Sequence, residues 1–302
     1  MYIADMHCDS LLKVSSDDGL ISKYNVSREY PSMQIFAAFV PKMREDPAIR
    51  RKRLMRYLNV YSSECTRLDI TPVRECIDLN YAITMEKRSS ILSIEGGGGL
   101  FSDSEELTTV HKMGVRVMGL CWDSNELASS AFGEVDTGLT DEGIRMVDRL
   151  SEMGIIIDVS HMSDKSVAQT LERTAYPVIA THSNFREVCD VKRNLPRSIA
   201  SEIASRGGVI GLNLYPGFLR TDGECRMDDL IRHIEYGLES FGEDVLGFGF
   251  DIDGTGGEYP IGIDESSSIH DRVTEMLLSR YSENLVKKIA GENVINFFKN
   301  NL

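Results

Sequence analysis

The residues best suited to chemistry begin at the N-terminus, where one residue separates His7 from Asp9. Side chains two positions apart on a β-strand point to the same side. An imidazole nitrogen and a carboxylate oxygen held side by side are suitable ligands for a divalent metal such as Zn²⁺ or Mn²⁺. Two ligands do not hold a metal alone, and so short a motif is more often an ordinary polar strand end. The significance of the pair therefore depends on the rest of the chain.

Four further apolar runs end on residues that bind metals or transfer protons. A strand buried on both faces reads as such a run. We predict strands at 90–94, 155–159, 177–180 and 245–250, which lead to Glu95, His161, His182 and Asp251. A (β/α)₈ barrel builds its active site at the carboxyl ends of its parallel strands. This recurrent placement of ionisable residues predicts such a barrel.

Amphipathic helices fill the intervals between these strands. Asp46 and Pro47 predict one helix start, and Thr140 predicts another before the strand at Ile155. Strands that alternate with helices of ten to fifteen residues indicate βαβ units and a parallel sheet. At 302 residues, one barrel uses the whole chain, so we expect an α/β fold of the TIM-barrel type as a single domain over residues 1–302.

Composition limits the classes of partner. Hydrophobic residues make up 42% and charged residues 26% of the chain, which is typical of a globular protein. The net charge of −14 argues against nucleic acid and anionic membranes as partners, because both attract a positive surface. The basic residues Arg50 to Arg53 and Arg56 are a local exception, which we interpret as the solvated face of a helix.

The chain shows no signal-like N-terminus and no run of about 18 apolar residues, so we expect neither a cleaved leader nor a membrane span. Its six cysteines show no CxxC spacing. They are typical of reduced thiols, because disulfide frameworks belong to shorter secreted chains. We therefore expect a cytoplasmic protein.

Six blocks of the sequence stand out together: His7-x-Asp9 and the segments 93–97, 157–161, 181–184, 193–196 and 249–254. Taken in order, they resemble the signatures of the membrane dipeptidase family, binuclear zinc peptidases of the amidohydrolase superfamily. They span nearly the whole chain. The resemblance implies a TIM barrel of the metallo-dependent hydrolase type.

The same resemblance implies two metal ions and assigns their ligands. His7 and Asp9 would bind one zinc, His161 and His182 the other, and Glu95 would bridge them. Zn²⁺ is the first expectation, and Mn²⁺ or Fe²⁺ stay open because affinity order and availability decide among them. A hydroxide shared by the two ions would be the nucleophile, and one ion would polarise the scissile carbonyl.

The resemblance also implies roles in substrate handling. Asp251 matches the general base that later acts as general acid, and Arg193 matches the arginine that receives the substrate's free carboxylate. These roles imply hydrolysis of small dipeptides, including those with a D-residue on the C-terminal side. A homodimer is the default assembly for a soluble enzyme of this type.

One position departs from the family pattern. Trp122 stands where the mammalian enzymes supply a histidine to the substrate carbonyl. An indole N–H donates one hydrogen bond but does not carry a positive charge as imidazole does. Trp122 could instead pack against the substrate, or it could be an ordinary core or rim aromatic. We expect a shift of substrate preference.

Two alternatives remain. Another binuclear amidohydrolase, acting on a cyclic amide or ester, would usually have His-x-His in its first strand and a carbamylated lysine as bridge, and this chain has neither. The second alternative is a non-catalytic metal-binding barrel. Only Trp122 favours it, because it replaces a histidine of the family, whereas the intact metal ligands and Asp251 argue against it. We assign no metal to His111, His233 or His270.

Overall fold

A parallel sheet forms the centre of the computed structural model, which describes residues 1–13, 30–40, 45–101, 104–263 and 268–302. In these ranges the sheet has eight strands, in the order β6-β5-β4-β2-β1-β8-β7, with β3 paired to β4 off this path. The strands are β1 (Ile3–Cys8), β2 (Ser32–Phe39), β3 (Thr71–Pro72), β4 (Ser89–Glu95), β5 (Val115–Gly119), β6 (Ile156–Asp158), β7 (Ile210–Leu212) and β8 (Leu246–Phe248).

The two ends of this path meet through a short segment. Ile179 bridges to Asp158 of β6, and Ala180 bridges to Ile210 of β7, both in parallel. These contacts close the sheet into a barrel, which confirms the predicted fold class. The strand predicted over 177–180 was too long, because only Ile179 and Ala180 pair. Pro177 has no N–H to donate, and the N–H of Thr181 donates to the Asp158 side chain at 2.9 Å instead of continuing the ladder.

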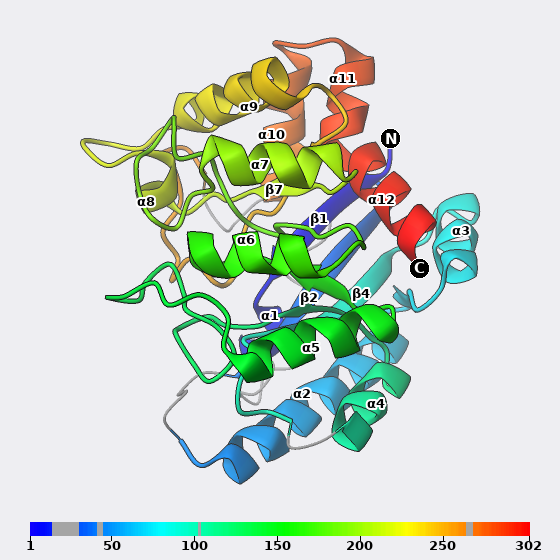
Figure 1. The fold of residues 1–302 in the computed structure, drawn as a ribbon. Helices are drawn as coiled ribbons and strands as arrows, with labels where there is room; N and C mark the ends of the chain where they lie inside the picture. The colour runs from blue at the N-terminus through cyan, green and yellow to red at the C-terminus, as the bar shows by residue number, and fades with distance from the viewer. Residues whose placement is uncertain (14–29, 41–44, 102–103, 264–267) are drawn as a thin grey trace.

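Helices surround the barrel, with α5, α6 and α7 lying across the front in Figure 1. The helices are α1 (Ser10–Lys13), α2 (Pro47–Arg67), α3 (Cys76–Thr84), α4 (Ser104–Lys112), α5 (Asp141–Glu152), α6 (Asp164–Arg173), α7 (Arg197–Ser205), α8 (Pro216–Leu219), α9 (Met227–Phe241), α10 (Ile269–Leu278), α11 (Glu283–Lys287), the π-helical turn η1 (Lys288–Glu292) and α12 (Asn293–Asn301). Among the described residues, none of these helices has the length and apolarity needed to cross a membrane.

The predicted helix starts are confirmed by their capping contacts. Asp46 precedes α2 and accepts a hydrogen bond from the N–H of Ala48 at 2.7 Å. Thr140 precedes α5 and accepts from the N–H of Gly143 at 3.0 Å. Each cap satisfies a backbone donor that the first turn of a helix leaves without a partner.

The amino end of the barrel is closed by apolar packing. Phe297 and Phe298 of α12 join a buried cluster with Met6 of β1 and Ile35 of β2, which come from the barrel interior. The turn η1 lies directly against β1, because a Cβ on Gly291 would come within 2.0 Å of the carbonyl oxygen of Tyr2. Glycine is therefore required where this last helical segment meets the first strand.

The interpretation of the basic run as a solvated face was wrong for one residue. Arg50 on α2 is 2% exposed, and its Nη1 donates to the carbonyl oxygen of Gly98 at 2.9 Å. Gly98 belongs to the loop that follows β4. Arg50 faces inward because α2 packs against this loop, a relation that the charge pattern of a single helix does not reveal. Lys52 and Arg56 are exposed, as predicted.

Candidate metal centre

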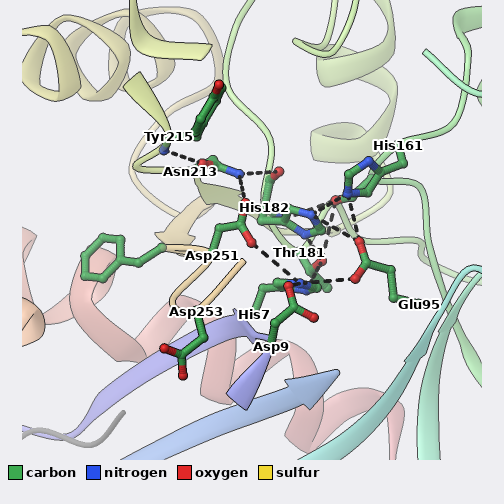
Figure 2. A network of polar contacts seen from close by, with 12 residues as sticks. His7, Asp9, Glu95, His161, Thr181, His182, Asn213, Tyr215, Asp251 and Asp253 are labelled. Carbon is green, nitrogen blue, oxygen red and sulfur yellow. Dashed lines mark hydrogen bonds and ion pairs between the residues drawn. The ribbon is translucent and has the colours of Figure 1, made fainter. Parts of the chain in front are cut away.

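Side chains from five positions around the barrel converge at the carboxyl ends of the strands (Figure 2). All of them are buried, with exposed fractions between 1% and 9%. The converging residues are those that the sequence singled out for metal binding and proton transfer: His7, Asp9, Glu95, His161, His182 and Asp251. Strand direction accounts for the convergence, because parallel strands end at the same rim of a barrel.

Glu95 stands between two sets of ligands. Its Oε2 lies 3.6 Å from Nε2 of His7, and its Oε1 lies 2.8 Å from Nε2 of His161. Nε2 of His182 is 3.7 Å from Oε1 of Glu95 and 2.8 Å from Nε2 of His161. Asp9 belongs to the His7 side, where its Oδ2 lies 3.6 Å from Nε2 of His7. The two oxygens of one carboxylate therefore face different ligand sets.

The backbone is strained where the site is built. His161 has a φ of 70°, Asp251 a φ of 58° and Asp253 a φ of 67°. Residues other than glycine adopt this left-handed region at a cost, and such strain gathers at functional sites. Gly254 makes room for the acids, because a Cβ there would lie within 2.3 Å of carboxylate oxygens of both Asp251 and Asp9.

Burial and charge set the protonation of the cluster. Burial, reinforced by neighbouring positive charges, holds the pKa of His161 and of His182 well below the usual value, so both rings are neutral and keep a free lone pair. Burial and the charge of Asp9 raise the pKa of Glu95 well above its usual range. Burial alone would lower the pKa of His7, but Glu95, Asp9 and Asp251 outweigh it and raise that pKa to about 10.

The donor set fits divalent metal ions. Among the described residues, Nε2 of His7 and Oδ1 of Asp9 are buried with no hydrogen-bond partner. Buried polar atoms without partners are costly unless something else satisfies them. Three groups of residues could each hold a metal, because the ligand atoms within each group lie within 4.8 Å of one another. Two groups share Glu95, and the third combines His7, His182 and Asp251. Nitrogen and oxygen ligands around an excess of carboxylate charge suit Zn²⁺, Mn²⁺ or Fe²⁺.

Asp251 has a partner that the sequence analysis missed. Nδ2 of Asn213 donates to Oδ2 of Asp251 at 3.0 Å, while Oδ1 of Asp251 lies 3.9 Å from Nε2 of His7. Asn213 directly follows β7, at the same rim as the ionisable residues. The sequence-based prediction used only ionisable residues after apolar runs, and extending it to amides would have found Asn213 after the run Val209 to Leu212.

Arg193 is buried against the same cluster. Its Nη1 donates to Oγ of Ser183 at 2.8 Å, and its Nη2 donates to the carbonyl oxygen of His182 at 2.9 Å. Each of these nitrogens carries a second N–H. The guanidinium lies 5.4 Å from the ring centre of Phe218, which lines the cavity above the ligands. These contacts fix the plane of the guanidinium beside the site.

A cavity of about 620 Å³ opens over the ligands, lined by Asp9, Glu95, His161 and Asp251 among others. Trp122 forms part of its wall and is 37% exposed. Its ring centre lies 5.5 Å from that of Phe39, 5.6 Å from that of Phe132 and 5.8 Å from that of His161. Trp122 is therefore not a core residue but lies at the rim of the cavity, and its contact with a substrate stays a prediction.

The three remaining histidines lie away from the ligand groups. His111 is on α4, His233 on α9 and His270 on α10. Nε2 of His270 pairs with Oδ2 of Asp5 at 2.8 Å inside the protein. None of the three belongs to the clusters that could hold a metal in the described residues.

Comparison with known proteins identifies the family. The family model for membrane dipeptidase, peptidase family M19, matches residues 1–301. The chain belongs to this family. Its fold is shared by the dipeptidase AC, a metallo peptidase of family M19, with a TM-score of 0.89 and 23% identity over 100% of this chain and 98% of that one.

Two further relatives of this M19 chain are informative. A metallo peptidase from Rhodobacter sphaeroides, liganded with a phosphinate mimic of the dipeptide L-Ala-D-Ala, superimposes with a TM-score of 0.88 and 22% identity over 100% of this chain and 99% of that one. Dipeptidase 3 of Mus musculus is 29% identical over 221 residues, which make up 71% of this chain and 45% of the mouse protein. The M19 chain therefore spans about half the length of that relative.

Proposed function

We propose that this chain is a dipeptidase that hydrolyses small dipeptides with two divalent metal ions, Zn²⁺ first, held by His7, Asp9, Glu95, His161 and His182. One observation carries the proposal: the two oxygens of the buried Glu95 carboxylate face two separate sets of ligands. A carboxylate placed in this way holds two cations together while it offsets part of their repulsion.

The ions, when bound, would lower the pKa of water and polarise the scissile carbonyl. Asp251 acts first as general base, taking a proton from the attacking water, and then as general acid, giving it to the leaving amine. Burial raises the pKa of its carboxyl group, which favours the return of the proton. The hydrogen bond from Asn213 holds Oδ2, so Oδ1 is directed toward the ligands.

Arg193 binds the substrate's C-terminal carboxylate. Its Nε is buried with no hydrogen-bond partner among the described residues, and its two terminal nitrogens each carry a second N–H, so the guanidinium keeps donors for a carboxylate. A required terminal carboxylate excludes endopeptidase action. The dipeptide mimic named for the Rhodobacter sphaeroides protein supports testing substrates with a C-terminal D-residue.

The aromatic wall formed by Phe39, Trp122 and Phe132 contacts a substrate side chain in this proposal. These rings offer apolar surface and one indole N–H. They offer no group that could replace an imidazolium at the substrate carbonyl. A preference for dipeptides with a large apolar residue follows from such a wall.

The experiment is hydrolysis of a panel of L,L and L,D dipeptides by purified protein, followed by release of free amino acids. The panel is repeated after chelation and after return of Zn²⁺, with dipeptide amides as controls for the terminal carboxylate. We expect activity on free dipeptides that disappears on chelation and returns with metal. Absence of hydrolysis by metal-replete protein would contradict the proposal and favour a non-catalytic metal-binding barrel.

Two properties beyond the site complete the proposal. The six cysteines form no disulfide, which supports a reducing compartment such as the cytoplasm. A homodimer stays a prediction from the resemblance.

A further inference from the structure

A chain of hydrogen bonds behind the proposed metal ligands begins at the buried carboxylate of Asp158, at the end of β6. Oδ1 of Asp158 accepts from the backbone N–H groups of Ser160 and Thr181, both at 2.9 Å. Oδ2 lies 2.5 Å from the hydroxyl of Thr181. A carboxylate only accepts hydrogen bonds, so the Thr181 hydroxyl is the donor in this bond.

The direction of this bond determines the next one. Oγ1 of Thr181 lies 2.8 Å from Nδ1 of His182. Because the hydroxyl proton points to Asp158, the hydroxyl oxygen offers only lone pairs to the ring, and Nδ1 of His182 must carry the proton. In a neutral imidazole the other nitrogen, Nε2, then bears the lone pair. Nε2 of His182 faces His161 and Glu95, on the side of the proposed metal.

The same hydroxyl also reaches the other ligand set. Nδ1 of His7 lies 3.5 Å from Oγ1 of Thr181, and the rings of His7 and His182 stack with their centres 3.7 Å apart. His7 and His182 belong to different halves of the proposed centre, on either side of Glu95. One hydroxyl on one short segment therefore contacts both halves (Figure 2).

We propose that Asp158 and Thr181 are positioning residues that fix His182 as its Nδ1–H tautomer and so preset its Nε2 for metal binding. This inference rests on the proposed metal centre. Hydrogen bonds to the outer nitrogen of a ligating histidine fix both its tautomer and its orientation, and loss of such a partner typically weakens metal binding about 10- to 100-fold. The carboxylate here acts through an intervening hydroxyl.

Asp158→Asn is the sharpest test, because the surroundings fix which way the new amide points. Two backbone N–H groups require the amide oxygen at the Oδ1 position, which places the NH₂ group against the Thr181 hydroxyl. The amide now donates to that hydroxyl, and the hydroxyl proton turns toward Nδ1 of His182. We expect the Nε2–H tautomer, with the lone pair directed away from the metal.

Three further variants separate this effect from a loss of folding. Thr181→Val removes the acceptor of Nδ1 at nearly constant volume, and Thr181→Ser restores it. Thr174→Val is the matched control, because Thr174 is also buried and its hydroxyl bonds to Ser151 and to the N–H of Tyr176, away from the ligands. Thermal unfolding of the metal-free proteins shows that each variant is folded. Should Asp158→Asn fail to fold, Thr181→Val decides.

Two measurements are made on each variant. Ring ¹⁵N NMR of the metal-free protein, assigned with a His182→Gln variant, reports the tautomer of His182. Competition with a chromophoric chelator gives the affinity for Zn²⁺ alone. We expect Nδ1–H in the wild type and in Thr181→Ser, and Nε2–H with Zn²⁺ binding about 10- to 100-fold weaker in Asp158→Asn and Thr181→Val. Thr174→Val should match the wild type.

An unchanged tautomer and a Zn²⁺ affinity within about threefold of the wild type in both Asp158→Asn and Thr181→Val would overturn the inference. A wild-type chain that binds no Zn²⁺ would instead overturn the proposed function. In that case the NMR result on metal-free protein still decides whether Asp158 and Thr181 set the tautomer. The two failures are therefore distinguishable.

Discussion

The two ends of the barrel differ in what their side chains bury, although the same strands form both. At the carboxyl end, three histidines and three carboxylates are buried together, and several of their polar atoms have no partner among the described residues. At the amino end, Phe297 and Phe298 of α12 belong to a buried apolar cluster that includes Ala4 of β1, Met33 of β2 and Ile91 of β4. Such a difference separates a site built for ligands from a base built for stability. Substitutions at the two ends should accordingly move different observables.

The largest effect is expected at the carboxyl end, from Asp251→Asn. An amide cannot take a proton from water, so kcat should fall by about 10³-fold, or about 4 kcal/mol in activation free energy. Both metal ions should stay bound and the stability should not fall, because the change removes a buried charge beside Asp9. Steady-state hydrolysis and metal analysis on the same sample check this. Loss of the metals would show that Asp251 is a ligand and would contradict its assigned role.

The amino end should respond in the opposite way. Phe298→Ala removes a fully buried ring and should lower the free energy of unfolding by about 3–4 kcal/mol, with kcat unchanged below the unfolding transition. Phe132→Ala is the control from the other end, because Phe132 is 48% exposed at the cavity and should cost little stability. Urea unfolding and dipeptide hydrolysis separate the two. A fall of kcat in folded Phe298→Ala would contradict the claim that the amino end affects stability and not catalysis.

The sequence predicted the carboxyl end better than the rest of the barrel. Polar residues after apolar runs located Glu95, His161, His182 and Asp251, because strand direction alone brings such residues to one rim. β2 was missed because no ionisable residue follows it directly to attract attention. Its contribution is packing, and its run of apolar residues was the only available signal.

The hydrogen-bond partners of the site residues were harder to predict than the places of those residues in the fold. Asn213 and Thr181 contact site residues through bonds that depend on how neighbouring strands and their loops lie side by side. The burial of Arg50 depends likewise on a loop 48 residues away. Periodicity and capping describe one element at a time, so contacts of this kind follow only from the assembled fold.

A smaller effect at the carboxyl end is expected from Arg193→Lys. Lysine keeps the charge but loses the planar fork, so kcat/KM for free dipeptides should fall about 10- to 100-fold, mainly through KM. Dipeptide amides provide the control, because they lack the carboxylate that the fork binds. Equal losses on dipeptides and amides would show that Arg193 supports the cluster and does not bind substrate.

The smallest effect concerns a histidine that lies in neither end. His233 on α9 accepts from the N–H of Phe185 through Nδ1 at 3.2 Å, and its Nε2 lies 3.3 Å from the carbonyl oxygen of Leu219. Both nitrogens are satisfied only in the neutral ring, whereas Nδ1 of His161 is left without a partner among the described residues. Burial lowers the pKa of His233 to about 4, although the hydrogen bond to the Leu219 carbonyl partly offsets this by raising the pKa.

The sign of the resulting pH dependence follows from linkage. His233 has a pKa near 6.5 in the unfolded chain and about 4 in the folded protein, so the unfolded chain binds its proton more tightly. The contribution of neutral His233 to stability is therefore complete above pH 6.5 and is lost as the pH falls toward 4. Between pH 7 and 5.5 the wild type should lose about 1 kcal/mol more than His233→Asn, which retains an acceptor near the Nδ1 position. Urea unfolding at both pH values measures the difference, while kcat at pH 7 should be unchanged. If the wild type and His233→Asn lost equal amounts of unfolding free energy, the titration of His233 would not be linked to folding. Hydrogen bonds to both ring nitrogens would then not identify a buried histidine as structural.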